Sequence, residues 1–482
     1  MYSHAKSWIR EHWVFCIVVG LSSLMYLALS LLRHWHFESN GFDLGIFDQA
    51  IWHYSRFEAP ASTVREIGNL LGDHFHPILV LSAPLYWLFP HAQTLLVAQI
   101  LLWAGSLFPI YLFAQAKGHS KLVSLLLVLS YVFFWGTTLT LYYDFHEIAF
   151  ALFLIPWIIY LIEIKQWKWF WWGVALLLLT KEDMGIVVAF LGVYLLVKHC
   201  WKQAAVAFLL GSAWFVVAIR ILIPHFGTHF GYWTYSNLGS TPQAAIKAII
   251  FHPINAFKLL ITPQVKLHTL LQIFWPFGFL SLFSPILIIG LPLLLERFWS
   301  DQGLYWVADF HYNGTIAAIL IMALADTLTK IKRLPISEKT VSRTILGITV
   351  LILIFNLSFL PKYQLRSLAD PTYWHLSAGQ KAGYQVLAKI PTDASVSTLN
   401  AILPHLTDRQ YAFMLAGNGK FYYTEYIIVS SEVNIFPFES MESLEQYIQS
   451  KITGRGYRLI INGGGWQVWQ NPSLANTIPV AS

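Results

Sequence analysis

The chain of 482 residues carries a formal net charge of +6, is 56% hydrophobic and only 12% charged, and has a mean hydropathy of +0.55. A soluble surface needs roughly twice that share of charged residues, so a bilayer is the expected solvent for most of the chain. The Lys and Arg residues stand in short clusters between apolar runs, which is typical of topology signals and speaks against a nucleic-acid partner.

About eleven apolar segments predict membrane-spanning helices within residues 14–360. The first, 14–32, is long for a signal-peptide core and lacks a small-residue cleavage site, so we interpret it as a retained helix. The others are expected at 93–114, 122–140, 148–164, 169–180, 184–198, 203–223, 269–283, 285–296, 312–329 and 344–360. Several are shorter than the ~20 residues of a straight span, which favours tilted or broken helices.

The basic clusters predict which loops face the cytoplasm. They follow alternate spans, so the positive-inside rule places the N-terminus in the cytoplasm and, with an odd number of spans, the C-terminus outside. We therefore expect a multi-pass protein of the cell membrane. Its all-α transmembrane domain would comprise residues 1–360 with a long first outer loop, 33–77, and residues 361–482 would form a small soluble extracytoplasmic α/β domain.

Two acids in the first outer loop are the leading catalytic candidates, because ionisable groups close to hydrocarbon are costly. Asp43 and Asp48 are five residues apart, so on one helix they would point roughly 140° away from each other and are not expected to act as a pair. Asp43 follows Gly41-Phe42 near a helix start, so it serves either as an N-cap or in catalysis.

The segment Gly72–Pro77 at the end of this loop carries Asp73, His74 and His76. Two imidazoles beside a carboxylate could position a substrate or bind a divalent metal ion. Histidines at a membrane interface also bind headgroups or form local hydrogen bonds. The cofactor therefore stays open at this point.

Further ionisable groups are predicted at the same outer face. In the segment 142–147, Asp144 and Glu147 would share one side of a helix and are candidates for catalysis, with His146 between them as a binding residue. The later segments supply Lys181, Glu182, Asp183, Arg297 and His311. The Lys–Glu pair either neutralises itself or contributes, with the Arg, a site for phosphate oxygens.

Together these motifs resemble a prokaryotic membrane-protein family known as domain of unknown function 2079. The resemblance covers nearly the whole chain and rests on the segments 42–49, 72–77, 83–86, 144–146, 181–183, 310–312, 390–396 and 406–409. That family is similar in architecture to the GT-C glycosyltransferases, which use polyprenyl-phosphate-linked sugars. By this likeness Asp43 would be the general base that deprotonates an acceptor hydroxyl.

The function that we expect is transfer of a sugar from a lipid-phosphate donor to an acceptor at the outer face. The partners would be the bilayer and the lipid-linked donor. A transporter or flippase-like protein using intramembrane acids is the first alternative, and a non-catalytic membrane scaffold is the second. An enzyme requires the acids to converge on one outer cavity that is closed toward the cytoplasm, whereas a transporter requires access from both sides.

Overall fold

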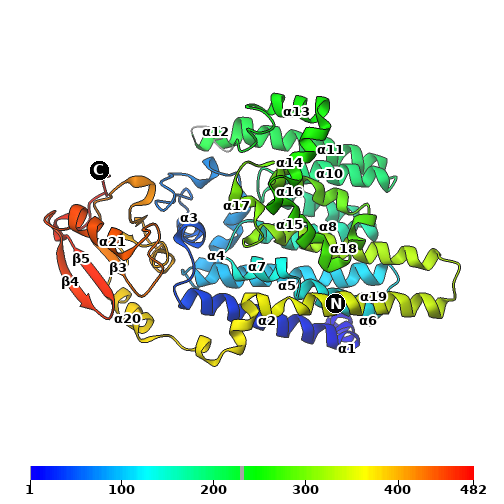
Figure 1. Cartoon of the computed structure of the whole chain (residues 1–482), viewed down its shortest axis with the longest axis horizontal. Helices are drawn as coiled ribbons and strands as arrows, with labels where there is room; N and C mark the ends of the chain where they lie inside the picture. The colour runs from blue at the N-terminus through cyan, green and yellow to red at the C-terminus, as the bar shows by residue number, and fades with distance from the viewer. Residues whose placement is uncertain (1, 228–232, 482) are drawn as a thin grey trace.

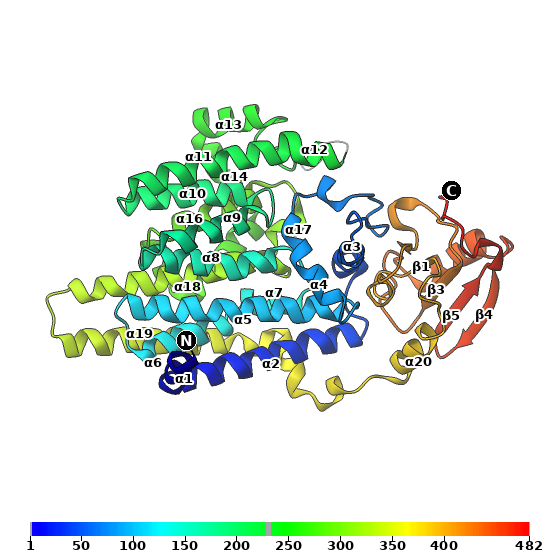
Figure 2. The ribbon, with the colours of Figure 1, turned by 180° about the vertical axis from the view of Figure 1, so that it is seen from behind.

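The computed structural model describes residues 2–227 and 233–481. Helices form an elongated bundle, and a small sheet domain built from the C-terminal residues lies at one end of it (Figure 1). We call that end of the bundle the domain end and the opposite end the far end. The hairpin between α18 and α19 lies at the far end (Figure 2).

Five helices in the described residues are long and apolar enough to cross a membrane, or up to seven if each of two bent pairs is one span. The five are α2 (Trp13–Trp35), α5 (Gln93–Ala116), α11 (Trp201–Val217) with its continuation to Phe226, α18 (Gly314–Thr329) and α19 (Glu338–Ser358). The expected polytopic α-helical class with a C-terminal α/β domain is confirmed.

The remaining expected spans are short or interrupted helices. They are α8 (Ile148–Glu163), α9 (Trp167–Leu178), α10 (Met184–Val197), α15 (Gln264–Phe274) and α16 (Leu287–Trp299). The segment expected as one helix at 269–283 ends at Phe274. Pro276 and Gly278, which has a φ of +56°, convert the rest into short turns.

The expected helix 122–140 is also bent. It divides into α6 (Lys121–Val132) and α7 (Trp135–Tyr142), which meet at 51°. The break frees the carbonyl of Val132, and the buried hydroxyl of Tyr26 on α2 donates a hydrogen bond to it. A polar side chain thus replaces the backbone partner that the bend removes, as hydrocarbon surroundings require.

Small residues bring α10 and α11 into close contact. A Cβ atom on Gly185 would lie 2.8 Å from the carbonyl oxygen of Gly211, and one on Gly192 would lie 2.6 Å from the backbone nitrogen of Phe208. Larger side chains would force the two backbones apart. This pairing is the small-residue packing found between membrane helices.

Residues 242–261 form two further helices. They are α13 (Pro242–Phe251) and α14 (Pro253–Ile261), each begun by a proline at its first position and bent by 105° relative to the other. Both helices carry exposed apolar residues, among them Ile246, Ile250, Phe251, Ile254 and Phe257.

The C-terminal domain is built on a five-stranded sheet with strand order β2-β1-β3-β5-β4. The strands are β1 (Val396–Thr398), β2 (Ala412–Met414), β3 (Tyr426–Ser430), β4 (Arg458–Gly463) and β5 (Trp466–Gln470). The first three pair in parallel and the last two join antiparallel. The helices α20 (Ala378–Leu387) and α21 (Met441–Tyr447) accompany the sheet.

This domain shares its hydrophobic core with the first loop of the chain. Leu44 and Ile51 from the loop belong to the same buried cluster as Leu403 and Ile427 from the domain. The backbone N–H of Gly41 donates to the carbonyl of Asn400 at 2.8 Å, and a Cβ on Gly41 would clash with Leu403. The loop and the domain are therefore a single packed unit that sits on the helical bundle.

Candidate active site

Asp43 lies at the domain end, in the short π-helical turn Gly41–Gly45 that leads into α3 (Ile46–Ser55). One carboxylate oxygen lies 3.1 Å from Nε2 of His146, and the other accepts a hydrogen bond from the hydroxyl of Tyr143 at 2.9 Å. The side chain is 24% exposed. It does not cap the helix, because its oxygens are turned toward the segment between α7 and α8.

Charge around Asp43 keeps its carboxyl group ionised. Burial raises the pKa of Asp43, but the hydrogen bonds from His146 and Tyr143 lower it by more, so the net pKa lies below the ordinary value. The same contact raises the pKa of His146 despite its burial. His146 is in turn stacked on His311, with ring centroids 3.8 Å apart. The result is a fixed carboxylate that can accept a proton.

A second pair lies next to His146. Glu147 is almost fully buried and its carboxylate lies 3.3 Å from Nζ of Lys181. Burial raises the pKa of Glu147, but Lys181 and the histidines 76, 146 and 74 lower it to about 2. The side chain of Lys181 is 22% exposed. The ammonium group therefore stays charged within reach of the surface.

Glu182 connects this pair to the end of the first loop. One oxygen lies 2.6 Å from Nδ1 of His74, and the other accepts from the backbone N–H of Phe75 at 3.0 Å. Burial raises the pKa of Glu182, while His74 and Lys181 bring it down to about 2. The contacts of Glu182 with His74 and Phe75 thus hold the loop segment 72–77 against the turn before α10.

Asp144 has a structural position. It forms an ion pair with Arg33 at the end of α2, and it accepts hydrogen bonds from the backbone N–H of Asn40 at 2.9 Å and from its side chain at 3.1 Å. Only 1% of the residue is exposed. Asp144 therefore fixes the turn that precedes Asp43, and a catalytic role for it stays a prediction.

Asp48 faces the C-terminal domain instead of the His146 network. It is completely buried, where the hydroxyls of Tyr86 and Thr407 contact its two oxygens. Burial, with a smaller contribution from Asp408, raises the pKa of Asp48 to about 8. A group bonded in this way joins the domain to the loop, and a catalytic role for Asp48 stays a prediction.

Asp73 and His74 contact protein partners, whereas the buried Nδ1 of His76 has no hydrogen-bond partner in the described residues. Asp73 lies 3.1 Å from Nε of Arg65, and His74 is held by Glu182. His76 is buried, and its burial lowers its pKa to about 4. Within residues 2–227 and 233–481, no three His, Cys, Asp or Glu side chains are grouped as a metal site would require. A divalent metal at this segment stays a prediction.

Arg297 and Asp183 complete the set of candidate residues. The guanidinium of Arg297 donates to the carbonyls of Tyr305 and Val307 and to Oδ1 of Asn313 at 2.6 Å. These acceptors are all neutral, so the hydrogen bonds do not cancel the cationic charge. Asp183 adjoins Lys181 and has a buried oxygen without a partner in the described part of the chain. Arg297 thus orders the segment that carries His311.

The far end of the bundle carries a different arrangement of charge. Nζ of Lys117, at the end of α5, lies 2.9 Å from Glu163 of α8 and 2.8 Å from Asp326 of α18. Asp326 also accepts from Ser284 at 2.7 Å. Lys332 donates to the carbonyl of Gly118 at 2.7 Å. These contacts join the ends of three helices across the far end.

Three contacts in the site were not expected from the sequence. They are the ion pair of Arg33 with Asp144, the hydrogen bond from Tyr143 to Asp43, and the hydrogen bond from Thr407 to Asp48. The available signal for Arg33 was its position directly beside the apolar run, where a buried cation requires a carboxylate partner. No sequence signal pairs Thr407 with Asp48, because 359 positions separate them.

Comparisons with known proteins agree with this architecture. Two crystal structures of ArnT from Cupriavidus metallidurans, one bound to undecaprenyl phosphate and one in the apo state, superpose with a TM-score of 0.50. Their sequence identities are 12% and 13%, and in both cases 98% of this chain and 100% of the other chain are covered. The likeness extends over the bundle and the C-terminal domain, and it confirms the GT-C type of fold.

No curated protein matches the sequence significantly. A family profile described as a predicted membrane protein, DUF2079, matches residues 33–462. That span begins at Arg33, includes Asp43 and every other residue of the network described above, and ends in β4. The chain therefore belongs to the DUF2079 family of predicted membrane proteins.

Proposed function

We propose that the protein is an integral membrane glycosyltransferase that moves a sugar from a polyprenyl-phosphate donor to an acceptor hydroxyl. The observation that carries the proposal is the Asp43 carboxylate, partly exposed and held by His146 and Tyr143 at the domain end. A fixed, ionised carboxylate beside a partly exposed ammonium group suits a reaction in which a hydroxyl loses a proton while a phosphate departs.

In the proposed step, the acceptor oxygen forms a bond to the anomeric carbon as the bond from that carbon to the phosphate oxygen breaks. The acceptor proton passes to Asp43, and the electron pair leaves with the polyprenyl phosphate. Lys181 and the uncancelled charge of Arg297 stabilise the departing anion. His146 and Tyr143 hold the carboxylate in the orientation that proton transfer requires.

The different arrangement of charged groups at the two ends of the bundle supports an enzyme over a transporter. The candidate groups gather at the domain end, which we place outside the cell, while ion pairs of Lys117 join the helices at the far end. A site that opens only outward is sufficient for transfer from a lipid that already stands in the outer leaflet. The structure of ArnT, which has a similar fold, is bound to undecaprenyl phosphate, and this supports a lipid-linked partner.

The test uses the purified full chain in nanodiscs with a polyprenyl-phosphate-linked hexose, and it measures release of polyprenyl phosphate in the presence of membrane glycolipid acceptors. A deletion strain supplies the second readout, namely loss of a membrane glycan. The wild-type chain should restore the glycan and Asp43→Asn should not, whereas Asp48→Asn should restore it. Equal rescue by all three chains would remove Asp43 from the mechanism.

A further inference from the structure

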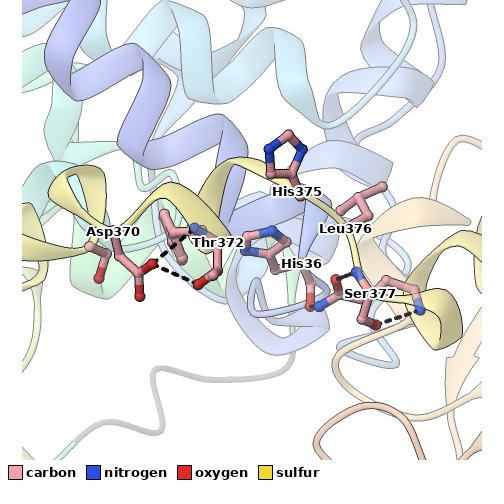
Figure 3. Close-up of a pocket in the computed structure, with 9 residues that line it drawn as sticks. His36, Asp370, Thr372, His375, Leu376 and Ser377 are labelled. Atoms are coloured by element: carbon pink, nitrogen blue, oxygen red, sulfur yellow. Dashed lines mark hydrogen bonds between the residues drawn. The ribbon is translucent and has the colours of Figure 1, made fainter.

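An open cavity, whose lining does not include Asp43, lies where the chain passes from the bundle to the C-terminal domain. Its volume is about 420 Å³, and it is lined by His36 at the end of α2 and by the connecting segment before α20. Figure 3 shows His36 between Thr372 and Ser377, with Asp370 at one side. This volume lies in the range of pockets that bind small ligands.

Two polar atoms of this cavity have no partner in the described residues. One is Nε2 of His36, a residue that is only 8% exposed, and the other is the hydroxyl of Tyr373. The two rings meet edge to face, with centroids 4.7 Å apart. Unpaired buried polar atoms are rare in folded proteins and costly, so both are suited to hydrogen bonds with a bound molecule.

Four other polar residues of the cavity are held in place by hydrogen bonds within the protein. One oxygen of Asp370 accepts from the backbone and the hydroxyl of Thr372, at 2.9 and 2.7 Å. Ser377 and Gln380 cap α20 reciprocally, and Gln380 also donates to the carbonyl of His36 at 3.2 Å. The cavity is therefore built by a fixed frame that joins α2 to α20.

The chemistry of the lining selects the class of ligand. Hydroxyl, imidazole, amide and carboxylate groups are present, and none of the nine lining residues is Lys or Arg. A phosphate would need such cations for affinity, and it would be repelled by Asp370. A neutral molecule with several hydroxyls and an apolar ring face matches the mixture of polar atoms and the Tyr373 ring.

We propose that this cavity binds a neutral sugar ring, with His36, Tyr373 and Asp370 as its hydrogen-bonding residues. The cavity opens at the outer end of a membrane helix, so the ring can belong to a free saccharide or to the headgroup of a glycolipid. The proposal does not depend on the transfer reaction, because the cavity is separate from Asp43 and is tested by binding alone.

The experiment measures saturation-transfer NMR between the full chain in amphipol, free of sugar detergents, and methyl glycosides of glucose, galactose and mannose. At least one glycoside should show transfer. Tyr373→Phe removes only the hydroxyl, and it should weaken binding about tenfold, as expected for a lost hydrogen bond of roughly 1–2 kcal/mol. Tyr411→Phe, a tyrosine outside the cavity, should bind like the wild type.

Competition experiments test whether the ligand is neutral. Inorganic phosphate and methylammonium should leave the sugar signal unchanged, whereas displacement by either ion would overturn the assignment to a neutral ligand. No transfer from any glycoside, or equal transfer in wild type and Tyr373→Phe, would also overturn it. Nanodiscs with and without a glucosyl lipid then separate the two sources, since loss of the glucoside signal only with the lipid identifies a glycolipid headgroup.

Discussion

The ion pairs of Lys117 at the far end of the bundle and the carboxylate of Asp43 at the domain end differ in how they are held. At the far end, Lys117 is shared between Glu163 and Asp326, and Lys198 lies 3.5 Å from Glu163, so the charges are balanced and the contacts hold helices together. At the domain end, Asp43 is held by neutral or weakly basic groups and stays partly exposed. Balanced ion pairs indicate a structural role. A partly exposed carboxylate that is fixed by hydrogen bonds indicates a catalytic one.

The largest effect should come from Asp43→Asn. The amide keeps the size of the side chain but cannot accept the proton, so the rate of transfer should fall by ~10²–10⁴. The measurement is release of polyprenyl phosphate by the folded variant. Asp48→Asn is the matched control, and transfer that stays above a tenth of the wild-type rate in Asp43→Asn would contradict the proposed base.

Lys181→Met tests the cation beside Glu147. Removing one member of a buried pair should destabilise the protein by ~3–5 kcal/mol, and it should also slow transfer because the leaving phosphate loses its cation. The double variant Lys181→Met with Glu147→Gln separates the two effects. It should regain the unfolding temperature but not the rate, so recovery of both would assign Lys181 a purely structural role.

Lys117→Met makes the complementary test at the far end. Glu163 and Asp326 would be left without their shared cation, which should lower the free energy of unfolding by roughly 1–3 kcal/mol. The rate of transfer per folded molecule should stay unchanged. Thermal unfolding and activity of the same preparation give both values, and a selective loss of activity would erase the distinction between the two ends.

The last prediction concerns Asp48 and pH. Burial raises its pKa to about 8 from an ordinary value of 3.8, so the native protein retains this proton where the unfolded chain has lost it. Stability from this group is full below pH ~4 and falls as pH rises toward ~8, by at most ~1.4 kcal/mol per pH unit.

Asp48→Asn mimics the protonated carboxyl and should remove this part of the pH dependence. The unfolding temperature of the variant should therefore decline less between pH 6 and pH 8 than that of the wild type, a window that follows from the raised pKa. Asp408→Asn is a useful companion, because it removes the smaller contribution to the same shift. A steeper decline in Asp48→Asn would show that the group is ionised in the native protein.

Much of the fold was predictable because hydropathy is a local property. The segments 93–114 and 312–329 correspond to α5 and α18 within two residues at each end, and 344–360 corresponds to α19, which begins six residues earlier. The interruptions were harder to predict, since a bend such as that between α6 and α7 depends on a hydroxyl from α2. The expected count of eleven spans exceeds the five to seven helices of sufficient length, because short apolar helices pack inside the bundle.

The candidate site was also predictable only in part. The motif around Tyr143 and Glu147 could be placed near Asp43 because topology puts both on one side of the membrane. The separate roles of Asp43 and Asp48 could not be assigned in advance. Their difference depends on His146 for the first and on Thr407 for the second, and these partners lie 103 and 359 positions away.

The core that joins the first loop to the C-terminal domain has a consequence for biosynthesis. The side chain of Asn400 accepts from the backbone of Phe42 across 358 positions of sequence. The ribosome synthesises the loop early and its covering domain last. The loop therefore stays uncovered while the later membrane helices are inserted. A nascent chain interrupted before β1 would carry Asp43 on an unsupported segment, and only the completed polypeptide can acquire the assembled site.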